Sequence, residues 1–212
     1  MDILLIILIF LPLAGGLLLL PMKKSSTGLI KATALGTSLA AFIVSLFIAS
    51  GFDPVNPGFQ MESSFPWVDT LSISFHTGID GMALLLILLT TFMTPIALLS
   101  SWNSIEHRVK EYVLMMLLLE TGILGVFSSL DIFLFYVFWE AMLIPMYFII
   151  GIWGGGNRIY AAVKFFLYTM AGSLLMLIAI IWLAYQGPVS LVDNPFALFP
   201  GHEWIQLAVD HQ

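Results

Sequence analysis

The stretch FYVFWEAMLIPMYFIIGIWG, residues 135–154, decides the fold because it holds one carboxylate among otherwise apolar residues. A run of about twenty such residues crosses a bilayer, and Glu140 falls near its centre. Since an ionisable group costs ~3 kcal/mol or more at that depth, an acid there is a functional-site hypothesis by default. Pro145 cannot donate a hydrogen bond to the carbonyl of Ala141. We therefore expect a kink beside Glu140, where water can enter.

Composition places the whole chain in the membrane. Of its 212 residues, 60% are hydrophobic and 9% are charged, which is too little polar surface for a soluble protein of this size. A net charge of −6 with no basic cluster argues against a nucleic-acid partner. The absence of cysteine excludes disulfides and thiolate-ligated metal clusters within this sequence. Any redox cofactor held through cysteine sulfur must then belong to a partner.

Six apolar runs are each roughly 17 residues or longer, enough for a hydrocarbon core of ~30 Å. They predict an all-α polytopic transmembrane domain over residues 1–186, with helices at about 3–21, 29–50, 79–102, 112–128, 132–153 and 159–186. The first run precedes its positive charges, so we interpret it as a retained helix rather than a signal peptide. Residues 187–212 are interrupted by prolines and predict an outer-face tail or a truncated connecting loop. Apolar and polar residues alternate over residues 71–76, which predicts a short strand.

The cations predict the orientation of the chain. Every Lys and Arg falls in or beside the first, third or fifth connection between the predicted helices. By the positive-inside rule these connections are cytoplasmic, which places both termini on the outer face. Most acids, Asp131 among them, fall on that outer side. Asp80 is expected to begin the third helix, where the helix dipole favours an acid.

Two acids are candidates for proton chemistry. Glu120 and Glu140 lie on neighbouring antiparallel helices, each ten residues from Leu130 at the centre of the turn. At 1.5 Å per residue both are expected ~15 Å below the outer surface, near the middle of the bilayer. A carboxyl at that depth can bind and release a proton, so the pair suggests a proton relay. The alternative is a neutral glutamic acid that only forms a hydrogen bond to another helix.

Lys164 is the third candidate. It lies ~7 to 8 Å nearer the cytoplasm than Glu140, so a role in proton entry requires water or a third group between them. The alternative is a side chain that extends back to the headgroups. His76, His202 and His211 show no metal-ligand spacing, and we predict no metal site and no cofactor in this chain.

Three segments together resemble the antiporter-like M chain of bacterial NADH–quinone oxidoreductase, and the mitochondrial chain four is similar. They are HTGIDGMALLLILLTTFMTPIALLSSW (76–102), LLLETGILGVFSSLDIFLFYV (117–137) and FWEAMLIPMYFIIGIWGG (138–155). Related L and N chains and sodium/proton antiporter subunits share the helix glutamate but not the surrounding sequence EAMLIPMYF. The resemblance covers essentially residues 1–186.

This resemblance implies a proton-translocating subunit in the membrane arm of respiratory complex I, in the bacterial inner membrane. Glu140 matches the family's essential glutamate on helix five, and Glu120 matches its partner on helix four. NADH, FMN, iron–sulfur clusters and quinone are then expected in partner subunits. The chain would belong to a multisubunit oxidoreductase without being catalytic alone.

One departure from the family leaves alternatives open. Family members contain two inverted repeats and a lysine on a broken helix seven that pairs with the helix-five glutamate. Only six helices are predicted here, so we expect a truncated product or a split gene whose second polypeptide supplies the rest. The rival functions are a subunit of a cation/proton antiporter or membrane-bound hydrogenase, and a non-conducting structural fragment with neutral glutamates.

Overall fold

The computed structural model describes residues 2–56, 58–68 and 73–186, and these form six helices and one hairpin. The elements are α1 Asp2–Leu19, α2 Thr27–Ser50, β1 Gln60–Val68, β2 Ile73–Ile79, α3 Gly81–Ser100, α4 Val109–Ser128, α5 Ile132–Trp153 and α6 Arg158–Gln186. The all-α polytopic prediction is confirmed. Of the six predicted membrane helices, α2 to α6 are each long and apolar enough to cross a membrane, whereas α1 has the shorter apolar stretch Ile3–Leu19. The predicted tail, 187–212, lies outside the described residues.

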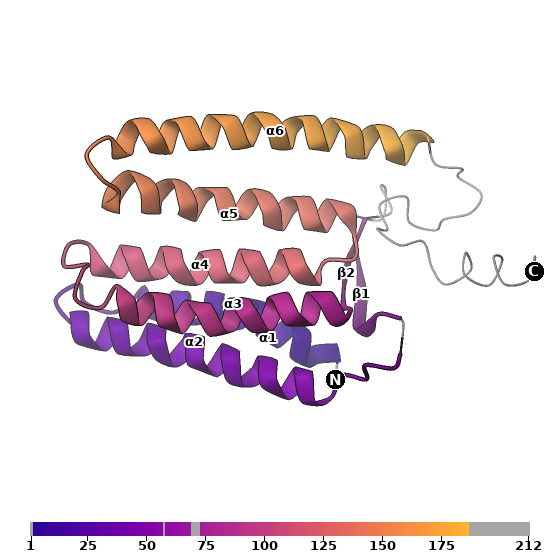
Figure 1. The fold of residues 1–212 in the computed structure, drawn as a ribbon, viewed down its shortest axis with the longest axis horizontal. Coiled ribbons are helices and arrows are strands. Elements are labelled where there is room, and N and C mark those ends of the chain that lie inside the picture. The colour runs from indigo at the N-terminus through magenta and orange to yellow at the C-terminus, as the bar shows by residue number, and fades with distance from the viewer. Residues whose placement is uncertain (1, 57, 69–72, 187–212) are drawn as a thin grey trace, which may run out of the picture.

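The helices run side by side, with α4 at the centre of the bundle (Figure 1). α4 contacts α1, α2, α3 and α5, whereas α6 packs against α5 at the outer edge. Burial follows this order: half of the residues in the most apolar 18-residue stretch of α4 are buried, against 11% in that of α6. The central position explains how α4 can hold polar residues out of contact with lipid.

The two ends of the bundle differ in charge. The connections α1–α2, α3–α4 and α5–α6 lie at one end, and the β-hairpin lies at the other (Figure 1). All seven Lys and Arg residues lie in these three connections or in the first two turns of the helices that follow them. Lys110 donates to the carbonyls of Leu20 and Met22 at 2.7 and 2.8 Å, and Lys24 pairs with Glu111. These contacts fasten the first connection to the start of α4.

The hairpin extends the strand that the sequence predicted. β2 pairs antiparallel with β1, which alternation did not reveal, and Phe65 lies opposite Phe75. The strand continues to Ile79, where we had expected a helix, while residues 71 and 72 lie outside the described part. The helix begins two residues later because Asp80 caps it, accepting a hydrogen bond from the amide of Ala83 at 2.7 Å.

Asp131 joins the hairpin to the bundle. It is one of the acids expected on the outer side, and its side chain is completely buried. One carboxyl oxygen accepts from the amides of Phe133 and Leu134 at the start of α5, at 2.9 and 3.1 Å. The other accepts from the amide of Ser74 in β2 at 3.2 Å. Asp131 is thus both a helix cap and a bridge to the sheet.

Replacing Asp131 by Ala is expected to lower the free energy of unfolding by about 2 kcal/mol, because a cap is lost and a part-buried amide of β2 loses its acceptor. Asp80→Ala is the matched control, since it removes one capping bond and is expected to cost about 1 kcal/mol. Denaturant unfolding of the detergent-solubilised protein, followed by circular dichroism, measures both. Equal losses would mean that the Ser74 contact contributes nothing.

Candidate functional site

The contact between α4 and α5 orients the two candidate acids. Two glycines of α4 receive side chains of α5: a Cβ at Gly125 would meet the ring of Phe138 at 2.3 Å, and one at Gly122 would meet Met142 at 2.5 Å. These two contacts, Gly125 with Phe138 and Gly122 with Met142, also set the antiparallel register of α4 and α5. Glu120 is therefore about three residues, or ~5 Å, deeper from the hairpin end than Glu140. Both acids remain near the middle of their helices.

Glu120 points away from α5. It is two residues from Gly122 and so about 200° around the helix, which turns its side chain towards α3. There it lies close to the hydroxyl of Thr94. Its side chain is 1% exposed, and neither carboxyl oxygen has a hydrogen-bond partner among the described residues. A buried carboxyl without partners is costly as an anion and favours the neutral acid.

Glu140 points away from α4 and towards α6. It is two residues from both Phe138 and Met142, which face α4. The phenol of Tyr136, one turn earlier, lies close to the Glu140 carboxyl and to the hydroxyl of Ser173 on α6. Glu140 is half-buried, and its Oε1 has no hydrogen-bond partner in the described part of the chain. Pro145, where the sequence predicts a kink, is buried within α5, and the helix continues past it to Trp153.

The structure does not bring the two acids into contact. They lie on opposite sides of the α4–α5 pair, and since packed helix axes are ~8–10 Å apart, the carboxyls are roughly 15 Å or more from each other. Direct proton transfer across that gap is impossible without intermediate groups. At an effective dielectric constant of 20, two charges at this distance interact by ~1 kcal/mol. The two acids can therefore influence each other electrostatically.

Lys164 lies on the outer face of α6. Its ammonium lies 5.7 Å from the ring centroid of Tyr160 and 5.9 Å from that of Tyr168, and all three side chains are exposed. The opposite face of α6 packs on α5, where Ala162 approaches Gly151. Lys164 thus points away from Glu140.

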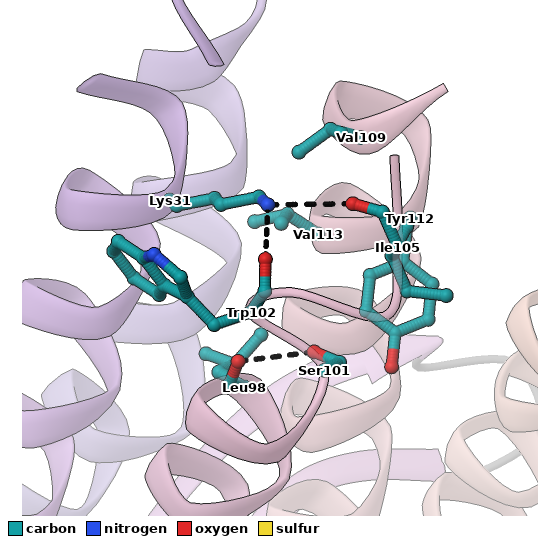
Figure 2. A pocket seen from close by; sticks show the side chains of 8 residues that line it. All are labelled: Lys31, Leu98, Ser101, Trp102, Ile105, Val109, Tyr112 and Val113. Atoms are coloured by element: carbon teal, nitrogen blue, oxygen red, sulfur yellow. Dashed lines mark hydrogen bonds between the residues drawn. The ribbon is translucent and has the colours of Figure 1, made fainter. Parts of the chain in front are cut away.

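A small pocket lies at the cationic end, beneath Lys31 (Figure 2). Its volume of about 10 Å³ holds at most about one water molecule. Lys31 donates to the carbonyls of Trp102 and Ile105, and its ammonium lies over the Trp102 ring. These carbonyls follow the end of α3, where a cation is favoured by the helix dipole. Lys31 therefore caps the end of α3, and we do not assign the pocket beneath it to a ligand.

Sequence reasoning missed the polar neighbours of the two acids, which are Tyr136, Ser173 and Thr94. Of these, only Tyr136 could have been found from the sequence, because a residue four positions before Glu140 lies on the same helix face. Thr94 and Ser173 come from other helices, so their approach depends on packing. Within the described residues no group of three metal-binding side chains occurs.

Comparison with known proteins identifies the chain. Residues 129–200 match the transmembrane family described as NADH:quinone oxidoreductase/Mrp antiporter. The chain is 46% identical over 185 residues to NADH-quinone oxidoreductase subunit M of Rhodobacter capsulatus, covering 85% of this chain and 36% of that protein. It is 43% identical over 180 residues to NADH-ubiquinone oxidoreductase chain 4 of Marchantia polymorpha, covering 84% and 36%.

A solved structure shares the fold. A chain of respiratory complex I from Thermus thermophilus, determined with bound NADH, superimposes with a TM-score of 0.76 and 26% identity. The match covers 91% of this chain and 38% of that one. The present chain thus spans little more than a third of the length of these relatives.

The fold and its two mid-helix acids define a polytopic membrane protein of the antiporter-like class. More closely, the chain belongs to the family of NADH–quinone oxidoreductase subunit M.

Proposed function

We propose that this chain is a proton-translocating segment in the membrane arm of an NADH–quinone oxidoreductase, in the bacterial inner membrane with its N-terminus outside. Electron transfer from NADH through FMN and iron–sulfur clusters to quinone takes place in other subunits. The observation that carries the proposal is the pair of mid-helix carboxyls: within the described part of the chain, both oxygens of Glu120 and the Oε1 of Glu140 are buried without a hydrogen-bond partner. Such groups are costly in a membrane and mark proton pathways.

The two acids have different roles in this proposal. Glu140 is the group that takes up and releases the proton, because it is half-buried and lies beside the polar Tyr136 and Ser173. Glu120 is sealed inside the bundle and acts on Glu140 through the electric field. In this proposal Glu120 is neutral at rest and loses its proton transiently during turnover, and while it carries the negative charge Glu140 binds its proton more tightly by ~1 kcal/mol.

Lys164 has a third role, in proton entry, and this role needs another helix or water to connect it to Glu140. Its ammonium faces away from α5, so it can affect Glu140 only through a helix or water that packs on the outer face of α6. A lysine at this depth, the seventh residue of α6 counted from the cationic end, can hold a proton near the cytoplasmic surface. We therefore place it at the entry to the pathway.

The experiment is Glu120→Gln in the assembled complex. Gln keeps the shape of the side chain but has no ionisable proton and no charge, so the coupling to Glu140 is lost and proton pumping is expected to slow about fivefold, equivalent to ~1 kcal/mol. Fluorescence quenching in inverted membrane vesicles measures pumping, alongside NADH oxidation. Asp53→Asn, in the exposed outer loop, is the control and should leave pumping unchanged. Wild-type pumping by an assembled Glu120→Gln complex would contradict the proposal.

A further inference from the structure

An open pocket lies at the cationic end of the bundle, between the α3–α4 connection and the α5–α6 turn. Its volume is about 520 Å³, within the range of pockets that hold small ligands. The residues that carry the argument are Arg108 and His107 on one wall, with Trp153 and Arg158 on the other. Neither the proton pathway nor the cap at Lys31 uses this pocket.

The pocket favours an anion. The side chains of Arg108 and Arg158 are exposed along its walls, whereas Glu106 is its single acid among the described lining residues. Arg158 uses its Nη1 to donate to the carbonyl of Ile152 at 2.9 Å, which leaves the rest of the guanidinium fork for a ligand. Two planar forks matched to tetrahedral oxygens are typical of phosphate recognition.

The walls of the pocket are held in place by contacts within the protein. The indole of Trp153, at the end of α5, donates to the carbonyl of His107 at 2.9 Å. The same ring packs edge-on against Tyr112 of α4, with the centroids 5.2 Å apart. The two connections that carry the arginines are therefore fixed relative to each other. A preformed site loses less entropy when a ligand binds.

The location of the pocket selects the kind of phosphate. Its walls lie where α4, α5 and α6 begin or end, so in a membrane they lie at the level of the lipid headgroups. Basic pockets between transmembrane helices on this side bind anionic headgroups. We propose that this pocket binds the phosphate of an anionic phospholipid, with Arg108 and Arg158 as its ligands.

Native mass spectrometry of the delipidated full chain, titrated with phosphatidylglycerol or phosphatidylcholine of the same acyl chains, tests the proposal. Since a cation near the surface contributes ~1 kcal/mol, we expect the wild type to prefer phosphatidylglycerol by tenfold or more. The double variant Arg108→Gln/Arg158→Gln should lower this preference to about twofold or less. Lys23→Gln/Lys24→Gln removes the same charge from the same end outside the pocket and should keep the preference.

Three results would overturn the proposal. The first is equal binding of the two lipids by the wild type, a measurement that needs no variant to fold. The second is an equal loss in the Lys23→Gln/Lys24→Gln control, which would mean a diffuse surface attraction. The third is saturation of the wild type by inorganic phosphate at concentrations that displace phosphatidylglycerol, which would mean a site for free phosphate.

Discussion

In the assembled complex, Glu140→Gln is expected to slow NADH-driven proton pumping about 100-fold or more, the scale on which a positioned acid or base contributes to proton transfer. The effect exceeds that of Glu120→Gln because Glu140 is proposed to carry the proton, whereas Glu120 only changes its affinity. Gln fits the same space beside Tyr136 and Ser173, so packing should be preserved. Pumping in inverted vesicles, measured beside complex assembly on native gels, tests this result.

Two further variants separate proton transfer from packing. Glu140→Asp keeps a carboxyl on a shorter side chain and should recover part of the lost rate. The double variant Glu120→Gln/Glu140→Gln should be no slower than Glu140→Gln alone, because without the carrier the field of Glu120 has nothing to act on. Additive losses would show that the two acids work in separate pathways. Wild-type pumping by Glu140→Gln would leave the buried carboxyl as a structural feature.

Much of the fold was predictable because apolar length alone determines where a chain crosses a membrane. The bounds of α5 were predicted to the residue. α4 begins three residues before the predicted start, since Lys110 and Glu111 are satisfied by contacts to the first connection rather than excluded from the helix. β1 was missed because its sequence, QMESSFPWV, lacks alternation and contains a proline.

The candidate site was predictable in depth but not in direction. Spacing placed Glu120 and Glu140 near the middle of adjacent helices, and the structure agrees within about three residues. Whether the acids meet depends on helix rotation, which is set by Gly122 and Gly125 receiving the side chains of α5. A glycine in an apolar helix carries no sign of what will pack against it. The separation of the acids could therefore not be read from the sequence.

The second large effect is expected at Gly125, where the α4–α5 contact leaves no room for a side chain. A Cβ there would lie 2.3 to 2.5 Å from three atoms of the Phe138 ring. Gly125→Ala is expected to cost about 2 to 3 kcal/mol by overpacking, and Gly125→Leu more. This contact also turns Glu120 and Glu140 to opposite sides. The variants keep both acids but disturb the packing that orients them, so we expect complex assembly to fail.

Gly36→Ala in α2 is the control, since nothing lies within 4 Å of its Cβ position, and replacing glycine in a helix should stabilise by roughly 0.5–1 kcal/mol. Denaturant unfolding in detergent measures both changes. Phe138→Ala in the Gly125→Ala background removes the clashing ring, so the double variant should lose less stability than the sum of the single variants. If the two losses simply add, Gly125 and Phe138 are not packed as described, and the orientation of both acids must be assigned again.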